Sequence, residues 1–394
     1  MADKVRICVD TVGNNTTGLY YPGQNITGRV ECLFPEGENV KLLKIQFKGL
    51  ARTEWTESET YYDDFFKEER TRDVTYNDEE VYFNAEHNLF QSSNENGFSI
   101  GRHMYPFSYV LPQQLPSSFE GTYGNVIYII KVTIDYPWKS SESLVLNLNI
   151  ISPLDLNTLP QLREPIAISM DKTPCSCWCQ NSGPITFNMS VPVTGFIPGQ
   201  EVNIGAFVEN MSNISAESVT FQIFQNVEYR VNFPLKTQYS ENLIADCIES
   251  GIGAHSEKSW TSTLIIPENG SYPNLISSNI IKMTYLLKGT LVLPLPHTNL
   301  TDNVNLVIGS VPLSGVNIGL LGPPQTYIAT APPLEDTVST GHINVSNDSQ
   351  PSQAISNGHH SMNVGWSLTG EGSKNFEFID APPSYDEARE LHYN

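Results

Sequence analysis

A proline–glycine turn lies within Tyr21-Pro22-Gly23-Gln24-Asn25-Ile26-Thr27-Gly28, and it recurs 176 residues later as Pro198-Gly199-Gln200. The residues that follow the two turns keep the same phase. At this offset five apolar positions coincide: Ile26 with Val202, Val30 with Ala206, Leu43 with Val219, Ile45 with Phe221, and Phe47 with Ile223. A chance tripeptide would not stay in phase with two alternating segments. Each turn therefore predicts the start of an equivalent strand in two copies of one β-fold.

Apolar and polar residues alternate through residues 1–312, which indicates half-buried antiparallel strands. The alternation is clearest at 5–9, 26–32, 43–47, 144–150, 185–191, 202–208, 219–224 and 283–287, and largely apolar runs occupy 126–134, 291–293 and 306–308. No long window has a helical period, and the acidic stretch from Tyr62 to Arg70 is expected to form a loop or hairpin tip. We predict an all-β chain with two tandem β-sandwiches, at 1–152 and 166–315, joined by a linker at 153–165.

Length and charge narrow the function classes. The 394 residues exceed one ordinary core, and the net charge is −21 with no basic segment. Binding to nucleic acid through its phosphates is therefore not expected. No apolar run approaches the ~20 residues of a membrane span, and no signal peptide is evident, so we expect a cytoplasmic chain without a transmembrane segment. Sequons such as Asn25-Ile26-Thr27 leave a secreted, glycosylated β-sandwich protein as an alternative.

The alternation ends near Val316, where proline pairs are scattered among Ser, Asn, Thr and Gly. Apolar side chains are too sparse there to offset the ordering of the backbone, so residues 316–394 are expected to be a disordered tail. This segment contains Ala381-Pro382-Pro383-Ser384-Tyr385-Asp386-Glu387. WW domains hold the P-P-x-Y pattern in aromatic-lined grooves. Pro382, Pro383 and Tyr385 are therefore the predicted docking residues, and the chain is predicted to be an adaptor.

Several motifs resemble those of the α-arrestins, the arrestin domain-containing proteins, in that family's order. They are the run from Tyr21 to Gly28, Phe47-Lys48-Gly49-Leu50-Ala51-Arg52-Thr53-Glu54-Trp55, Pro106-Phe107-Ser108-Tyr109, Leu115-Pro116-Ser117-Ser118-Phe119-Glu120-Gly121, and Val307-Ile308-Gly309-Ser310-Val311-Pro312-Leu313. The resemblance implies two immunoglobulin-like sandwiches, the arrestin N- and C-domains. It also implies recruitment of HECT-type ubiquitin ligases through PPxY motifs to membrane receptors or transporters. Such cargo is then ubiquitinated and endocytosed, which implies work at the plasma membrane and endosomes.

The tail departs from the family in one respect, because members commonly carry two PPxY motifs. Here Pro332-Pro333-Leu334-Glu335 has Glu in place of Tyr, and Pro323-Pro324-Gln325-Thr326-Tyr327 has one residue too many. A single site forgoes much of the avidity that two linked sites give. A retromer-like sorting subunit, which would bind a fixed coat partner and work without the tail, remains the alternative function.

Two further clusters are candidate sites. Lys44, Lys48 and Arg52 form the densest basic group of the first half, and they are either a cradle for phosphorylated or acidic cargo or one solvated strand face. Cys175, Cys177 and Cys179 have the spacing C-x-C-x-C, which suits plain thiols at a strand entry or palmitoylation. No CxxC or His pair lies nearby to complete a metal site. No catalytic motif is present, so neither an enzyme nor a cofactor is expected.

Overall fold

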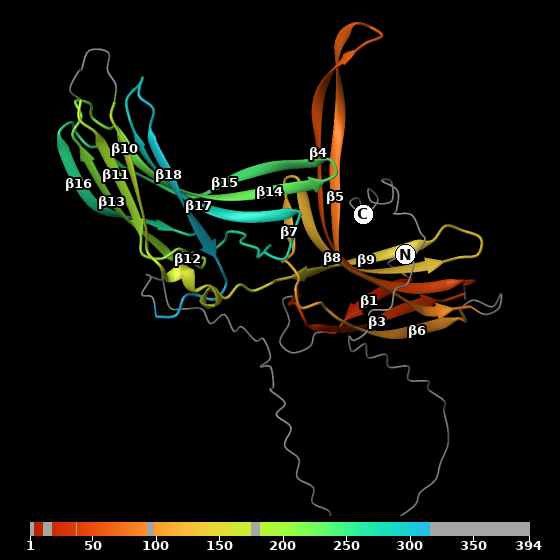
Figure 1. Cartoon of the computed structure of the whole chain (residues 1–394). Coiled ribbons are helices and arrows are strands. Elements are labelled where there is room, and N and C mark those ends of the chain that lie inside the picture. Colours follow the sequence, from red (N-terminus) through yellow and green to blue (C-terminus); the bar gives the residue numbers. More distant parts are fainter. Residues whose placement is uncertain (1–3, 11–17, 37, 93–97, 175–181, 316–394) are drawn as a thin grey trace, which may run out of the picture. The chain divides into compact units, whose positions relative to one another are not determined.

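The computed structural model describes residues 4–10, 18–36, 38–92, 98–174 and 182–315 (Figure 1). In these ranges there are eighteen strands, two short 3₁₀ helices and no α-helix. This confirms the all-β prediction and the hairpin tip expected between Tyr62 and Arg70. The predicted disordered tail lies outside the described residues.

The first sandwich is built from nine strands. They are β1 (Val5–Val9), β2 (Leu19–Tyr20), β3 (Asn25–Phe34), β4 (Leu42–Asp63), β5 (Glu68–Gln91), β6 (Gly101–Val110), β7 (Phe119–Gly121), β8 (Gly124–Asp135) and β9 (Glu142–Ile150). One sheet has the order β1-β3-β6, and the other has the order β2-β9-β8-β4-β5, with β7 also paired to β8. Pro106 is tolerated because β6 is an edge strand and needs no donor on its open side.

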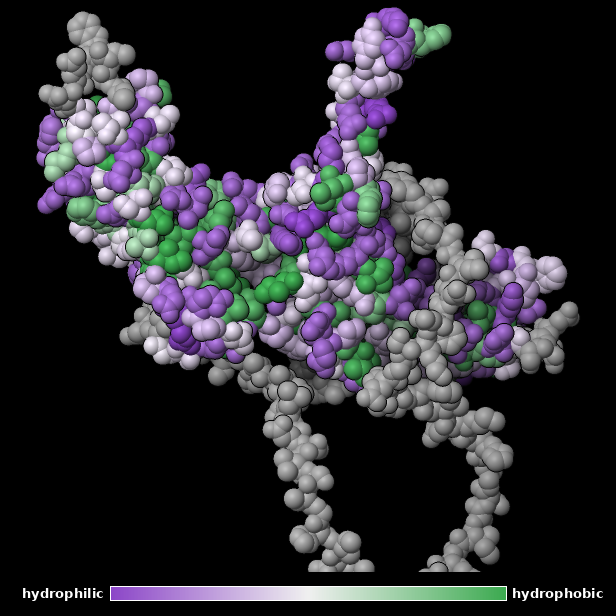
Figure 2. All heavy atoms as spheres, viewed as in Figure 1, coloured by the Kyte–Doolittle hydropathy of each residue, from purple (hydrophilic) through white to green (hydrophobic). Residues whose placement is uncertain are grey.

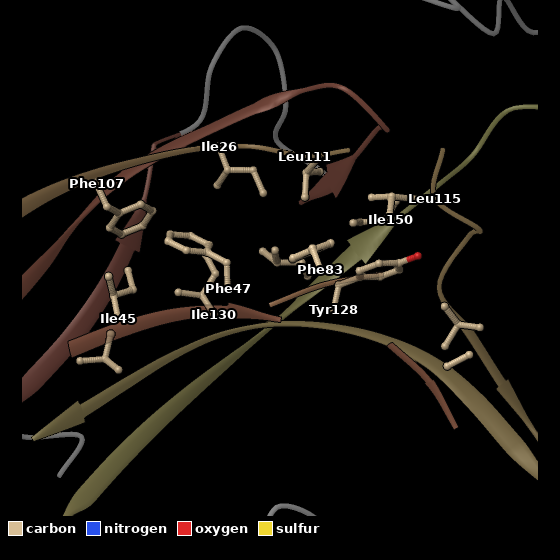
Figure 3. Packing of buried hydrophobic residues seen from close by; sticks show 14 of the residues in the cluster. Ile26, Ile45, Phe47, Phe83, Phe107, Leu111, Leu115, Tyr128, Ile130 and Ile150 are labelled. Carbon is tan, nitrogen blue, oxygen red and sulfur yellow. The ribbon is translucent and has the colours of Figure 1, made fainter. Parts of the chain in front are cut away.

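Aromatic and aliphatic side chains from both sheets fill the space between them (Figure 3). The Phe47 ring of β4 stacks at 4.5 Å on Tyr109 of β6 and meets Phe107 edge-on at 5.7 Å. Tyr128 is fully buried, and its hydroxyl donates to the carbonyl oxygen of Pro116 at 2.7 Å. That hydrogen bond removes the penalty of burying the phenol, so Tyr128 serves the core.

The second sandwich follows two 3₁₀ helices, η1 (Leu156–Thr158) and η2 (Pro160–Arg163), which lie in the predicted linker. Its strands are β10 (Ile166–Lys172), β11 (Ile185–Val191), β12 (Gly195–Phe196), β13 (Glu201–Asn210), β14 (Ser218–Asn232), β15 (Leu235–Ser250), β16 (Ser256–Ile265), β17 (Ile281–Val292) and β18 (Leu300–Ile308). One sheet has the order β10-β11-β13-β16, and the other has the order β12-β18-β17-β14-β15. A separate apolar cluster fills the space between them, including Phe187 and Phe221.

The internal repeat is confirmed in detail. Strands β2 and β3 are followed 176 residues later by β12 and β13, with the same lengths. Gly23 and Gly199 both adopt positive φ, +77° and +84°, a conformation that favours glycine. In each turn the glutamine side chain accepts a backbone N–H three residues earlier: Gln24 from Tyr21 at 3.0 Å, and Gln200 from Ile197 at 2.8 Å. The five apolar pairs of the repeat are all buried.

Candidate functional site

The three predicted basic residues are brought together on β4, but each has a carboxylate neighbour on β5. Lys48 Nζ lies 3.1 Å from Glu79, and Arg52 lies 3.0 Å from the other oxygen of the same side chain. Lys44 Nζ lies 3.8 Å from Glu86. Partial burial alone would raise the pKa of Glu79, but hydrogen bonds from Arg52 and Lys48 outweigh it and hold that pKa below its usual value. Glu79 is therefore a firmly ionised partner for both cations.

This pairing limits what the basic row can bind. Three cations of β4 share two carboxylates of β5, and Lys131 of β8 lies opposite Gln46 on the same face. An anionic ligand would have to displace Glu79 from Lys48 and Arg52 before it could make bidentate contacts of its own. The row is therefore a pre-paired face that would bind an anion by exchange.

The two sandwiches are linked by polar contacts, and several of these have a carboxylate of the first sandwich as acceptor. Carboxylates of β4 and β5 accept hydrogen bonds from the end of β14, the start of β15 and the segment before β17. The contacts are Lys236 Nζ to Glu57 at 3.0 Å, the Asn232 backbone N–H to Asp78 at 2.9 Å, and the Asn279 backbone N–H to Glu80 at 2.8 Å. Since side chains 154 to 199 residues apart meet here, sequence reasoning did not find this link.

An apolar contact between the two sandwiches lies beside these hydrogen bonds. Tyr229 of β14 is 1% exposed and belongs to the apolar cluster of the first sandwich. Its hydroxyl accepts the backbone N–H of Thr122 at 3.1 Å, and its ring meets Tyr123 edge-on at 5.6 Å. Val231 and Ile281 extend the same cluster. The first sandwich therefore uses side chains of the second to complete its own core.

A cleft of about 300 Å³ lies beside the linker. Its lining is neutral, and includes Ser117, Asn149, Ser152, Tyr272 and Asn274. Ser117 Oγ already accepts the backbone N–H of Ser152 at 2.9 Å and that of Asn274 at 3.3 Å. With no charged side chain in its lining, the cleft has no group to select a charged ligand.

The remaining predicted site residues fall outside the described ranges. Pro382, Pro383 and Tyr385 lie in the tail, and Cys175, Cys177 and Cys179 lie between β10 and β11. Their roles in WW-domain binding and palmitoylation stay predictions.

Within the described part of the chain, no group of His, Cys, Asp and Glu side chains is placed to hold a metal ion. No helix in that part is long and apolar enough to cross a membrane. Among the described cysteines, Cys32 is buried, which raises the pKa of its thiol to about 11. That thiol therefore stays protonated and unreactive at neutral pH.

Sequence reasoning also passed over the aromatic residues at the β4–β5 turn. Phe65 is 86% exposed and Phe66 is 54% exposed. The available signal was a pair of adjacent phenylalanines inside a stretch already expected to be a hairpin tip. At a hairpin tip, Phe65 and Phe66 could not have been expected to pack in a core.

Two tandem sandwiches, each opened by the same turn and each with its own core, define an arrestin-type architecture. Residues 9–157 match the family model of the arrestin (or S-antigen) N-terminal domain, and residues 181–313 match that of the arrestin C-terminal domain. The chain belongs to the α-arrestin family, the arrestin domain-containing proteins.

Relatives with that name occur in several animals. The chain is 26% identical to arrestin domain-containing protein 17 of Caenorhabditis elegans, over 85% of this chain and 80% of the relative. It is 28% identical to arrestin domain-containing protein 1 of Rattus norvegicus, over 66% of this chain and 58% of the relative. It is 27% identical to arrestin domain-containing protein 4 of Homo sapiens, over 76% and 70% respectively. The chain thus spans less than two thirds of the length of the rat relative.

Proposed function

We propose that this protein is a trafficking adaptor that brings a WW-domain, HECT-type ubiquitin ligase to membrane receptors or transporters. The observation that carries the proposal is the combination of two arrestin sandwiches with a PPxY motif in the same chain. In this proposal the sandwiches hold the cargo, the tail holds the ligase, and the ligase performs the chemistry. The adaptor would work in the cytoplasm and be recruited to the plasma membrane and endosomes.

Tethering supplies the catalytic advantage in this scheme. A flexible tail of this length would have a reach of about 5 nm. A ligase bound at Pro382, Pro383 and Tyr385 would then stand near cargo lysines at an effective concentration on the order of mM. Because only one intact motif is present, a ligase with several WW domains would gain no avidity from a second site on the same tail.

The tail supplies its own matched control for a binding test. WW-domain titrations against the full chain should lose binding with Tyr385→Ala and keep it with Tyr327→Ala, because Tyr327 stands one residue too far from its proline pair. Equal affinity of wild-type protein and Tyr385→Ala would contradict the docking assignment.

Cargo binding by the basic row can be tested with two substitutions that should change the affinity in opposite directions. We propose that Lys44, Lys48 and Arg52 receive an acidic or phosphorylated cargo segment by exchange with the β5 carboxylates. Glu79→Gln removes the competing charge, so affinity for a phosphopeptide should rise, whereas Lys48→Ala should lower it. A phosphopeptide that binds all three proteins equally would remove this face from the cargo site.

Deletion of 316–394 separates the adaptor from a retromer-like sorting subunit. The adaptor proposal expects cargo ubiquitination to be lost while cargo binding persists. A fixed coat subunit would retain its sorting activity without the tail, and that result would favour the alternative.

A further inference from the structure

The β4–β5 hairpin extends well beyond the sheet that supports it (Figure 1). Strand β4 pairs with β8 only as far as Thr53, opposite Gly124, but continues to pair with β5 as far as Asp63, opposite Glu68. Residues 54–63 therefore form a two-stranded ribbon that reaches about 30 Å at the usual rise of a strand. The contacts of Glu57 and Asp78 with the second sandwich brace its base.

The end of this ribbon is a built turn. One carboxylate oxygen of Asp63 accepts the backbone N–H groups of Phe65 and Phe66, at 3.0 and 3.1 Å. The Asp63 carbonyl accepts the N–H of Lys67 at 2.7 Å, and Lys67 has a positive φ of 56°. The two phenyl rings meet edge-to-face at 4.9 Å. The rings are thus presented in one conformation, which lowers the entropy cost of burying them later.

The charges beside the rings are largely matched. Arg70 lies 3.8 Å above the Phe66 ring centre, 2.8 Å from Glu68 and 3.6 Å from Asp63. Nearby, Lys67 pairs with Asp64 at 3.8 Å, and Arg72 pairs with Glu59 at 3.4 Å. Residues 61–72 hold four carboxylates and three cations, a net charge of −1, so the exposed rings select an apolar environment and not an oppositely charged peptide.

The turn combines exposed apolar rings with a charged pair, since Asp64 and Lys67 beside the two phenylalanines are 92% and 71% exposed. Phe65 and Phe66 lie at the end, Tyr61 and Tyr62 follow at 40% and 56% exposure, and Arg70 and Arg72 flank them. Figure 2 shows hydrophobic and hydrophilic residues side by side at the end of the hairpin, and mostly hydrophilic residues along its shaft. The phenyl rings suit the acyl side of a bilayer interface, and the tyrosines and charged side chains around them suit its headgroup side.

We propose that the tip, Tyr61 to Arg72, inserts into the headgroup–acyl boundary of a membrane, with Phe65 and Phe66 entering first. The convex tip offers no groove for a peptide, and its paired charges suit zwitterionic phospholipid. This inference is independent of the PPxY motif. It gives the adaptor a lipid contact that does not depend on ligase or cargo.

Flotation of the full chain with phosphatidylcholine vesicles tests the proposal. We expect wild-type protein to partition into the vesicles and Phe65→Ser with Phe66→Ser to reduce partitioning by about ten-fold or more. Phe233→Ser is the matched control, because Phe233 is 93% exposed at the β14–β15 turn. That control should bind as wild-type protein does.

Two further arms identify the source of any binding. Binding to phosphatidylcholine should persist at high salt, and added phosphatidylserine should weaken it, because the net charge of −21 opposes an anionic surface. In Phe65→Trp, the added indole emission should be quenched by lipid brominated on its acyl chains.

Failure of wild-type protein to bind vesicles would overturn the proposal, as would equal binding by the double variant or an unquenched Trp at position 65. If the double variant kept vesicle binding but lost capture of a receptor's cytoplasmic segment, the tip would be a protein-docking element instead. No ligase is present in these assays, so their outcome is separate from that of the PPxY test.

Discussion

The two sandwiches share their opening turn and core pattern, but they differ in the hairpin that follows. In the first, β4 and β5 run for 22 and 24 residues, whereas in the second β14 and β15 run for 15 and 16. The extra length of the first hairpin lies beyond the sheet and, apart from Trp55 and Tyr76 near its base, adds little to the core. The alternation of buried and exposed residues therefore specifies the same framework in both sandwiches. The length of the first hairpin can change more freely, because little of the core depends on it.

Equivalent truncations in the two cores should destabilise the two sandwiches to a similar extent. Phe47→Ala and Phe221→Ala each remove a ring that is at most 1% exposed, so each should lower the free energy of unfolding by about 3 to 5 kcal/mol. Urea unfolding of the two variants measures this directly. A loss below about 1 kcal/mol in either variant would show that its cluster is not the core described above.

The paired turns offer a smaller effect. Gly23→Ala and Gly199→Ala place a Cβ in left-handed backbone, 2.5 Å from Nε2 of Gln113 and 2.8 Å from a carboxylate oxygen of Glu268. We expect about 1 to 2 kcal/mol of destabilisation in each case, since a flexible side-chain end can withdraw. Thermal unfolding of both variants checks the result, and a loss in only one of them would end the equivalence of the turns.

The turn glutamines should separate the two copies. Gln200 is 4% exposed, whereas Gln24 is partly exposed. When the glutamine is replaced by Ala, water can therefore take its place as acceptor for the backbone N–H of Tyr21 but not for that of Ile197. Gln200→Ala should therefore cost about 1 to 3 kcal/mol and Gln24→Ala about 1 kcal/mol or less. Chemical denaturation of the pair decides the point, and the reverse order would contradict the burial argument.

The smallest expected effect concerns pH and the link between the sandwiches. A hydrogen bond from the Trp55 indole, followed by one from Lys236, lowers the pKa of Glu57 below its ordinary value of 4.5. The stabilising contribution of this carboxylate is therefore complete above pH 4.5 and is lost as the pH falls through the lowered pKa. The stability difference between wild-type protein and Glu57→Gln should follow that course in urea unfolding at several pH values. A pH-independent difference would exclude the ionised contact as its cause.

Much of the framework could be predicted from sequence, because burial on one face leaves a period-two pattern in strands such as β3, β11 and β13. Strands β5, β15 and β16 were harder to find. Much of β5 pairs in a ribbon away from the core, and β15 and β16 lie at sheet edges, so polar residues occupy most of their positions. Edge and ribbon strands bury too few side chains to leave a periodic apolar pattern in the sequence.

The candidate site was less predictable for a different reason. Lys48 and Arg52 were identifiable as a basic group, but their neutralisation depends on the β4–β5 register, which brings Glu79 alongside from about thirty residues away. The contact of Asn232 with Asp78 depends on the packing of two domains. The PPxY motif is the opposite case, since a short linear motif can be recognised from sequence without any fold.

Proximity labelling in cells tests the adaptor proposal most directly, with the labelling enzyme fused to the wild-type chain, to Tyr385→Ala and to Tyr327→Ala. The proposal predicts that wild-type protein and Tyr327→Ala label both a HECT-type ligase and membrane cargo, whereas Tyr385→Ala keeps the cargo and loses the ligase. A ligase signal that survives Tyr385→Ala undiminished would contradict the proposal.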